Sequence, residues 1–180
     1  MKFNIALMVT WLRIGMAPAC FLLLLSGFPF WAVVLFAVAS FSDGLDGYLA
    51  RKYDLVTEFG KSLDPIADKV LVLLVSCALL YLSYSFELAL VIVLMSVREL
   101  LVSYLRSRFS HVSGLEVSHL AKWKTTMQMI ALSVLMLALK WPVFSSYGLF
   151  LLQISLVLSW LSFRSYAKNI REHLTISEAR

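Results

Sequence analysis

The segment from Asp43 to Lys69 reads DGLDGYLARKYDLVTEFGKSLDPIADK and carries six carboxylates between strongly apolar stretches. The whole chain has 180 residues, of which 61% are hydrophobic and only 15% are charged. A soluble domain of this length cannot bury so much apolar surface, so the composition predicts a protein embedded in a lipid bilayer. Acidic groups at membrane depth are costly and by default indicate a function.

Six apolar stretches surround or overlap the acidic segment, and each approaches the ~20 residues that a helix needs to cross a bilayer. Only helices satisfy the backbone here, since no strand-like alternation indicates a barrel. We therefore predict an all-α polytopic membrane protein with six transmembrane helices. The predicted helices are Leu7–Ser26, Phe30–Leu49, Leu63–Tyr84, Leu88–Leu105, Thr125–Leu139 and Val143–Phe163.

The distribution of Lys and Arg predicts the orientation of these helices. The connections after the second and fourth stretches are rich in positive charge, whereas those after the first and third have none. By the positive-inside rule, both termini and the acidic segment should face the cytoplasm. We expect residues 1–163 to form a single transmembrane catalytic domain and residues 164–180 a short polar cytoplasmic tail.

The net charge of +5 fits the same picture, because basic loops meet anionic lipid headgroups. Nucleic-acid binding is the weaker interpretation, since no basic face alternates with aromatic residues. Arg13 would interrupt the apolar core of a signal peptide, so we expect the first helix to be retained.

The aspartates of the acidic segment have helical spacing. Asp43 and Asp46 are three residues apart, and Gly47 and Ala50 follow on the same helix face. Asp64 and Asp68 are four residues apart and share a face of the next helix. A short connection lets the two helices lie side by side, so four carboxylates should converge at their cytoplasmic end.

Four converging carboxylates repel one another and raise one another's pKa values unless cations intervene. Hard oxygen ligands suit Mg²⁺ or Mn²⁺, which bind few carboxylates together with substrate phosphates. Small residues at positions 47 and 50 leave room for a nucleotide, and Arg51 can bind a phosphate through two hydrogen bonds. The structural alternative is that Asp64 only caps a helix and that Asp43 or Asp46 only pairs with Arg51.

The full pattern resembles the signature of the CDP-alcohol phosphotransferase family, D-x2-D-G-x2-A-R-x8-G-x3-D-x3-D, without departure. Eight fixed positions over 26 residues make the match specific. They are Asp43, Asp46, Gly47, Ala50, Arg51, Gly60, Asp64 and Asp68.

This resemblance implies a six-helix membrane fold, commonly a homodimer, with its active site open to the cytoplasm. It implies transfer of a phosphatidyl group from CDP-diacylglycerol to an alcohol, with release of CMP. It also implies that Asp43, Asp46 and Asp64 bind two divalent ions and that Asp68 is the general base. We count Asp68 among the candidate metal ligands as well.

The N-terminal stretch FNIALMVTWLRIGMAP resembles the branch of this family that uses glycerol 3-phosphate. Asn4, Thr10, Arg13 and Pro18 match that branch, and Ala6 replaces its usual proline. The stretches VRELLVSYLRSR and AKWKTTMQM resemble it too. We assign nucleotide binding to six residues: Asn4, Thr10, Gly47, Ala50, Arg51 and Gly60.

Glycerol 3-phosphate is a dianion and needs cations near an acidic metal site. Arg98 and Arg106 lie about two helical turns apart, and Lys122 and Lys124 lead into the next predicted helix. We predict that these four form the acceptor-phosphate pocket. The alternatives are that they meet only lipid headgroups, which we favour for Arg108, and that Arg98 pairs with Glu99 or an aspartate.

We therefore expect transfer from CDP-diacylglycerol to sn-glycerol 3-phosphate, giving phosphatidylglycerophosphate and CMP at a bacterial cytoplasmic membrane. The nearest rival uses the same chemistry with serine or inositol phosphate as acceptor. A divalent-cation transporter is a rival from another class, but it would spread its acids along a path through the bilayer. A silent scaffold conflicts with the intact signature.

Overall fold

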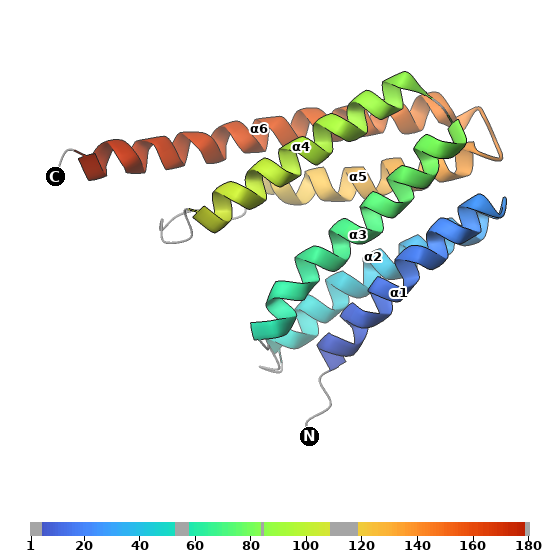
Figure 1. Ribbon diagram of the computed structural model, residues 1–180, viewed down its shortest axis with the longest axis horizontal. Helices are drawn as coiled ribbons and strands as arrows, with labels where there is room; N and C mark the ends of the chain where they lie inside the picture. Colours follow the sequence, from blue (N-terminus) through green and yellow to red (C-terminus); the bar gives the residue numbers. More distant parts are fainter. Residues whose placement is uncertain (1–4, 53–57, 84, 109–118, 179–180) are drawn as a thin grey trace. The chain divides into compact units, whose positions relative to one another are not determined.

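A computed structural model of the chain describes the backbone of residues 5–52, 58–83, 85–108 and 119–178. Within these ranges the side chains are described except at 5–10, 43–52, 58–68, 106–107, 119–122, 165–166, 169–170 and 172–178. All regular structure in the described ranges is helical, which confirms the all-α class. Figure 1 shows the six helices: α1 Ile5–Leu25, α2 Pro29–Lys52, α3 Glu58–Ser83, α4 Phe86–Arg108, α5 His119–Ala138 and α6 Phe144–Glu178.

The helices extend beyond several apolar stretches. Helix α3 begins at Glu58 rather than Leu63, and α5 begins at His119 rather than Thr125. Helix α6 runs through the predicted tail to Glu178. Hydropathy marks the part of a helix at membrane depth, whereas backbone hydrogen bonding continues through polar residues that also form helices well.

The chain divides into two compact units. The first contains α1, α2, α3 and residues 132–145, and the second contains residues 85–131 together with α6 from Ser146 onward. The prediction that residues 1–163 form one catalytic domain stays a prediction.

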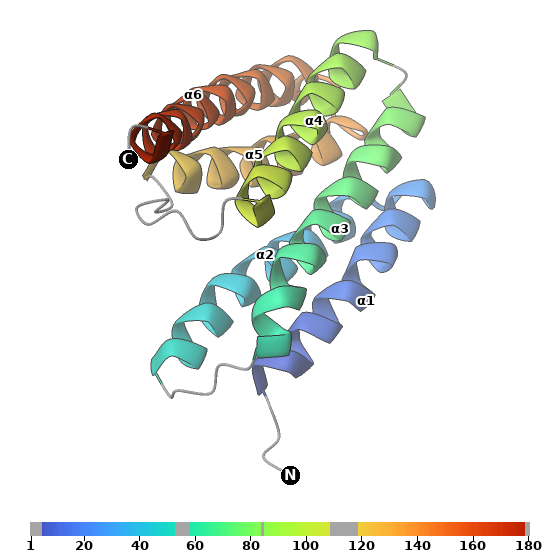
Figure 2. The same cartoon turned by 60° about the vertical axis from the view of Figure 1, so that its left-hand side comes forward.

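In the first unit, α1 packs against both α2 and α3, and α2 also contacts α3 (Figure 2). The residues at the packing surfaces recur at helical spacing and many are small. Ala17 and Cys20 of α1, Ala32 and Ala39 of α2 and Ala78 of α3 are fully buried. Small side chains let helix backbones approach closely, which favours packing in a bilayer, where apolar burial alone does not drive association.

In the second unit, buried serines line one face of α6. Ser155, Ser159 and Ser162 are buried and follow the buried Leu152 at intervals of three or four residues. They give α6 a narrow, polar stripe where it meets α4 and α5, and hydrogen bonds described below cross it. Small hydroxyl residues at such a stripe are typical of membrane helix pairs.

Large apolar side chains cover the outer surfaces of both units. On α4 these include Phe86, Leu100 and Tyr104, each more than half exposed. Within the described residues, two helical segments are long and apolar enough to cross a membrane, Phe86–Leu105 and Phe144–Arg164. Shorter apolar segments occur in the first three helices, at Trp11–Leu25, Pro29–Ser42 and Lys69–Ser83. The chain has the character of a membrane protein.

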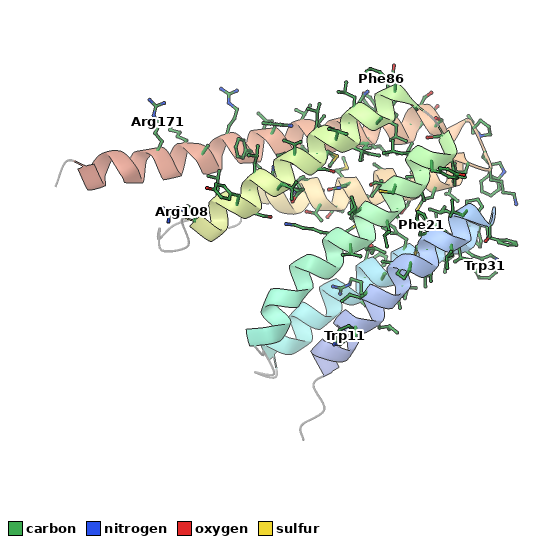
Figure 3. All side chains as sticks on the ribbon, viewed as in Figure 1. Trp11, Phe21, Trp31, Phe86, Arg108 and Arg171 are labelled. Atoms are coloured by element: carbon green, nitrogen blue, oxygen red, sulfur yellow. The ribbon has the colours of Figure 1, made fainter. Side chains whose placement is uncertain are left out.

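Two exposed tryptophans of the first unit fit this character. Trp11 lies in the second turn of α1 and Trp31 in the first turn of α2, toward opposite ends of the α1–α2 pair (Figure 3). Both side chains are more than half exposed. Indole rings at the two ends of a membrane helix pair match the preference of Trp for membrane–water interfaces.

Candidate active site

The signature occupies the end of α2 and the beginning of α3. Asp43, Asp46, Gly47, Ala50 and Arg51 lie in the last ten residues of α2. Gly60, Asp64 and Asp68 lie in the first eleven residues of α3, at intervals of four. In both views, the end of α2 and the start of α3 lie at one end of the first unit, where α1 also begins (Figures 1 and 2). The described backbone therefore brings both halves of the signature to the same end of three packed helices.

Helical geometry places the signature residues on defined faces. Positions 43, 46, 47 and 50 follow the i, i+3, i+4, i+7 pattern of one helix face, and 60, 64 and 68 follow an i, i+4, i+8 row. The backbone thus supports the face-sharing that the sequence predicted within each helix. The side chains of these residues lie outside the described set, and so does Asn4 entirely.

Arg13, which the sequence matched to the family branch without a role at the site, also lies in this region. It belongs to α1, its side chain is 1% exposed, and its Nε donates a hydrogen bond of 3.3 Å to the carbonyl oxygen of Ala39 in α2. Ala39 precedes Asp43 by one helical turn. A charged residue inside an apolar helix is the sequence signal that could have suggested a role for Arg13, because burying such a charge is costly.

The Arg13–Ala39 contact sets the register of α1 against α2. From this contact, Thr10 lies three residues toward the start of α1 and Asp43 four residues toward the end of α2. Because the two helices run antiparallel and a helix rises ~1.5 Å per residue, Thr10 and Asp43 reach about the same level. Thr10 and Arg13 of the N-terminal match therefore belong to the same region of the first unit as the aspartate signature.

A second group of predicted residues lies in the second unit. Arg98 of α4 and Lys124 of α5 are both buried, at 4% and 6% exposure. Arg98 Nη1 lies 3.2 Å from Oε1 of Glu99, and Lys124 Nζ pairs with the same oxygen. The structure therefore contains the Arg98–Glu99 pairing that the sequence raised as an alternative. It also brings together Arg98 and Lys124, which were predicted to act together.

Helix α6 completes this group through its serine stripe. Arg98 Nε donates to the carbonyl oxygen of Ser159 at 3.0 Å, and Ser155 Oγ donates to the carbonyl oxygen of Lys124 at 2.9 Å. The guanidinium of Arg98 is thus held by groups of α4 and α6, and the backbone of Lys124 is bonded to α6. The backbone of Arg106 lies in the last turn of α4 and that of Lys122 in the first turn of α5.

Arg108 differs from the buried cations. It is the last residue of α4, at the far end from Phe86, and its side chain is exposed (Figure 3). An exposed cation just beyond an apolar helix is the usual arrangement for contact with lipid headgroups. This position fits the interpretation favoured from sequence.

The chemistry of the signature fits divalent metal ions. Four carboxylates from two consecutive helices, without Cys or His in the segment, form a hard oxygen donor set. Among the side chains that the structure describes, no other group of three or more His, Cys, Asp or Glu residues can hold a metal.

Residues 3–162 match the family model described as CDP-alcohol phosphatidyltransferase. The chain belongs to this family. Its members generally depend on divalent metal ions.

Curated relatives place the chain more closely. A protein of Escherichia coli K12 is 35% identical over 176 residues, which cover 93% of this chain and 97% of the relative. A Haemophilus influenzae protein is 38% identical over 142 residues, or 76% and 77% of the two chains. A Rickettsia bellii protein is 52% identical over 108 residues, or 59% of each. All three are named CDP-diacylglycerol–glycerol-3-phosphate 3-phosphatidyltransferase. No solved structure matches the chain.

Proposed function

We propose that this chain is a CDP-diacylglycerol–glycerol-3-phosphate 3-phosphatidyltransferase. It would transfer the phosphatidyl group of CDP-diacylglycerol to sn-glycerol 3-phosphate, giving phosphatidylglycerophosphate and CMP. The observation that carries the proposal is the intact eight-position signature at one end of the first three helices. The name shared by the three relatives supports the choice of acceptor.

In this reaction the acceptor hydroxyl oxygen attacks the phosphorus that bears the diacylglycerol. A new P–O bond forms, the P–O bond to the CMP phosphate breaks, and the hydroxyl proton passes to Asp68. Asp43, Asp46 and Asp64 would hold two Mg²⁺ or Mn²⁺ ions. When bound, these ions neutralise charge on the diphosphate and on departing CMP. Direct attack needs no covalent enzyme intermediate.

The remaining assignments follow from residue chemistry. Gly47 and Ala50 leave space for the nucleotide, and Arg51 binds a phosphate through its guanidinium fork. Gly60, Asn4 and Thr10 are assigned to the nucleotide by their match to the family pattern. The acceptor's phosphate is assigned to Arg98, Arg106, Lys122 and Lys124.

We extend the proposal to the membrane arrangement. The Lys and Arg distribution supports six membrane-crossing helices with both termini and the signature on the cytoplasmic side. Bacterial relatives support the inner membrane as the location. The family resemblance supports a homodimer, and nothing in the charge pattern favours a nucleic acid.

The acceptor is tested by measuring CMP release from the purified protein in detergent with CDP-diacylglycerol and Mg²⁺. Glycerol 3-phosphate, serine, inositol and inositol phosphate are supplied in separate reactions. Release with glycerol 3-phosphate alone is the expected result. Release with a different acceptor would keep the phosphatidyl transfer and overturn the acceptor assignment. If the protein binds CDP-diacylglycerol but releases CMP in none of the reactions, the proposed enzymatic activity is wrong.

Arg106→Ala should raise the KM for glycerol 3-phosphate far more than the KM for CDP-diacylglycerol. A hydrogen bond to a charged group contributes about 1.5–3 kcal/mol, which corresponds to roughly 10- to 100-fold in binding. Steady-state CMP release with each substrate varied in turn measures the two constants. Arg108→Ala is the matched control, since it removes an exposed guanidinium two residues away. Equal increases in both constants would indicate a general structural role for Arg106.

A further inference from the structure

Glu99 lies between two cations that come from different helices. Its Oε1 pairs with Nη1 of Arg98 on the same helix and with Nζ of Lys124 on α5, 25 residues further along the chain. The side chain of Glu99 is 30% exposed, whereas those of Arg98 and Lys124 are 5% and 8% exposed. Glu99 is therefore the most accessible member of a largely buried charge cluster.

The three side chains are one carboxylate and two cations, and hydrogen bonds fix part of their geometry. Nε of Arg98 is fixed to the Ser159 carbonyl and Nη1 to Glu99, so two edges of the guanidinium are fixed in place. Two cations this close repel each other, and a shared carboxylate oxygen between them offsets that repulsion.

Burying these charges costs free energy, so the arrangement indicates a function. Buried ion pairs seldom stabilise a protein more than apolar residues of the same size would, because desolvation offsets the attraction. Within a membrane helix, charged residues are by default functional. A carboxylate that orients the groups that bind a ligand is a common arrangement in binding sites, and its loss weakens binding without removing any direct contact.

We propose that Glu99 is a positioning residue for the acceptor's phosphate. By pairing with both Arg98 and Lys124, it holds the two cations close together so that both can bind a phosphate dianion. The inference rests on the proposed function and adds to it a residue outside the signature and outside the assigned cations. It also bears on acceptor choice. The two cations attract a phosphate dianion, whereas a zwitterion such as serine carries no net charge.

Glu99→Gln keeps the shape of the side chain and removes its charge. In metal sites, loss of the carboxylate that orients a ligand lowers affinity by roughly 10- to 100-fold, and we expect the lower end of that range here. The KM for glycerol 3-phosphate should rise about 10-fold, and the KM for CDP-diacylglycerol should stay within about twofold. Glu99→Asp should recover part of the loss, because it restores the charge on a shorter side chain.

The matched control is Glu87→Gln, which removes an exposed carboxylate from the first turn of the same helix. It should leave both constants unchanged. Binding of radiolabelled glycerol 3-phosphate to the detergent-purified protein gives a second readout that does not require turnover. It should weaken in Glu99→Gln and recover in part in Glu99→Asp.

The outcomes separate this inference from the function beneath it. If the unaltered protein releases CMP with glycerol 3-phosphate but Glu99→Gln changes both KM values equally, or neither, the positioning role is wrong and the function stands. A lower KM in Glu99→Gln would also overturn the inference, since Glu99 would then compete with the phosphate for the cations. If the unaltered protein neither binds nor uses glycerol 3-phosphate, the proposed function fails and the inference falls with it.

Discussion

Asp68→Asn should abolish nearly all CMP release while CDP-diacylglycerol still binds. An amide has almost the size of a carboxylate, but it cannot accept the proton that the acceptor hydroxyl loses as it attacks phosphorus. General base catalysis commonly contributes about 10²- to 10⁴-fold to a rate, so kcat should fall by that order. The measurement is CMP release at saturating concentrations of both substrates, beside direct binding of CDP-diacylglycerol to the purified variant.

The control for this result is Asp54→Asn, which removes a carboxylate that lies between signature positions but is not one of them. It should release CMP at the normal rate. If the turnover of Asp68→Asn is within a few-fold of normal, Asp68 is not the general base. Loss of lipid binding along with turnover would instead indicate that Asp68 acts mainly with the metal-binding carboxylates.

Asp43→Asn should lose both turnover and the stabilisation that divalent ions give the unaltered protein. An ion that binds only the folded state at 100 times its Kd stabilises that state by about 2.7 kcal/mol. For a chain of this length, that corresponds to a rise in Tm of roughly 5–10 °C. The thermal transition in detergent, measured with EDTA and then with Mg²⁺ or Mn²⁺, should show this rise in the unaltered protein and little of it in Asp43→Asn.

Glu87→Gln provides the comparison, because the exposed carboxylate that it removes lies on α4 in the other unit. Its Tm should respond to the ions as the unaltered protein does, and EDTA should abolish CMP release by both. A full ion-induced rise in Asp43→Asn would show that this aspartate is not needed to hold the metal. If EDTA changes neither the Tm nor the turnover of the unaltered protein, the proposed metal site is wrong.

Much of the fold could be predicted because its causes are local. A bilayer demands helices of about 20 apolar residues, and hydropathy finds them without knowledge of tertiary contacts. The same reasoning misplaced the starts of α3 and α5, at Glu58 and His119, because polar residues continue a helix after the apolar stretch has ended. The aspartate spacing was equally informative, since 3.6 residues per turn converts separation in sequence into a shared face.

Contacts between helices were beyond such reasoning. The hydrogen bond from Arg13 to the Ala39 carbonyl joins residues 26 apart, and the pairing of Lys124 with Glu99 joins residues 25 apart. Neither sequence position identifies the other, because a buried cation donates a hydrogen bond to whichever carbonyl or carboxylate oxygen packing brings within reach. The buried serines of α6 likewise look like ordinary polar residues until Ser155 and Ser159 meet the groups on α4 and α5.

The chemistry follows from local sequence: the helical class, the carboxylate signature with its family, and the cations suited to a phosphate. Which of these groups meet depends on tertiary packing. It set the level of Thr10 against Asp43 through Arg13, and it placed Glu99 between Arg98 and Lys124. The physical reason is that helix formation depends on neighbouring residues, whereas the register between packed helices depends on how small side chains from distant segments fit together.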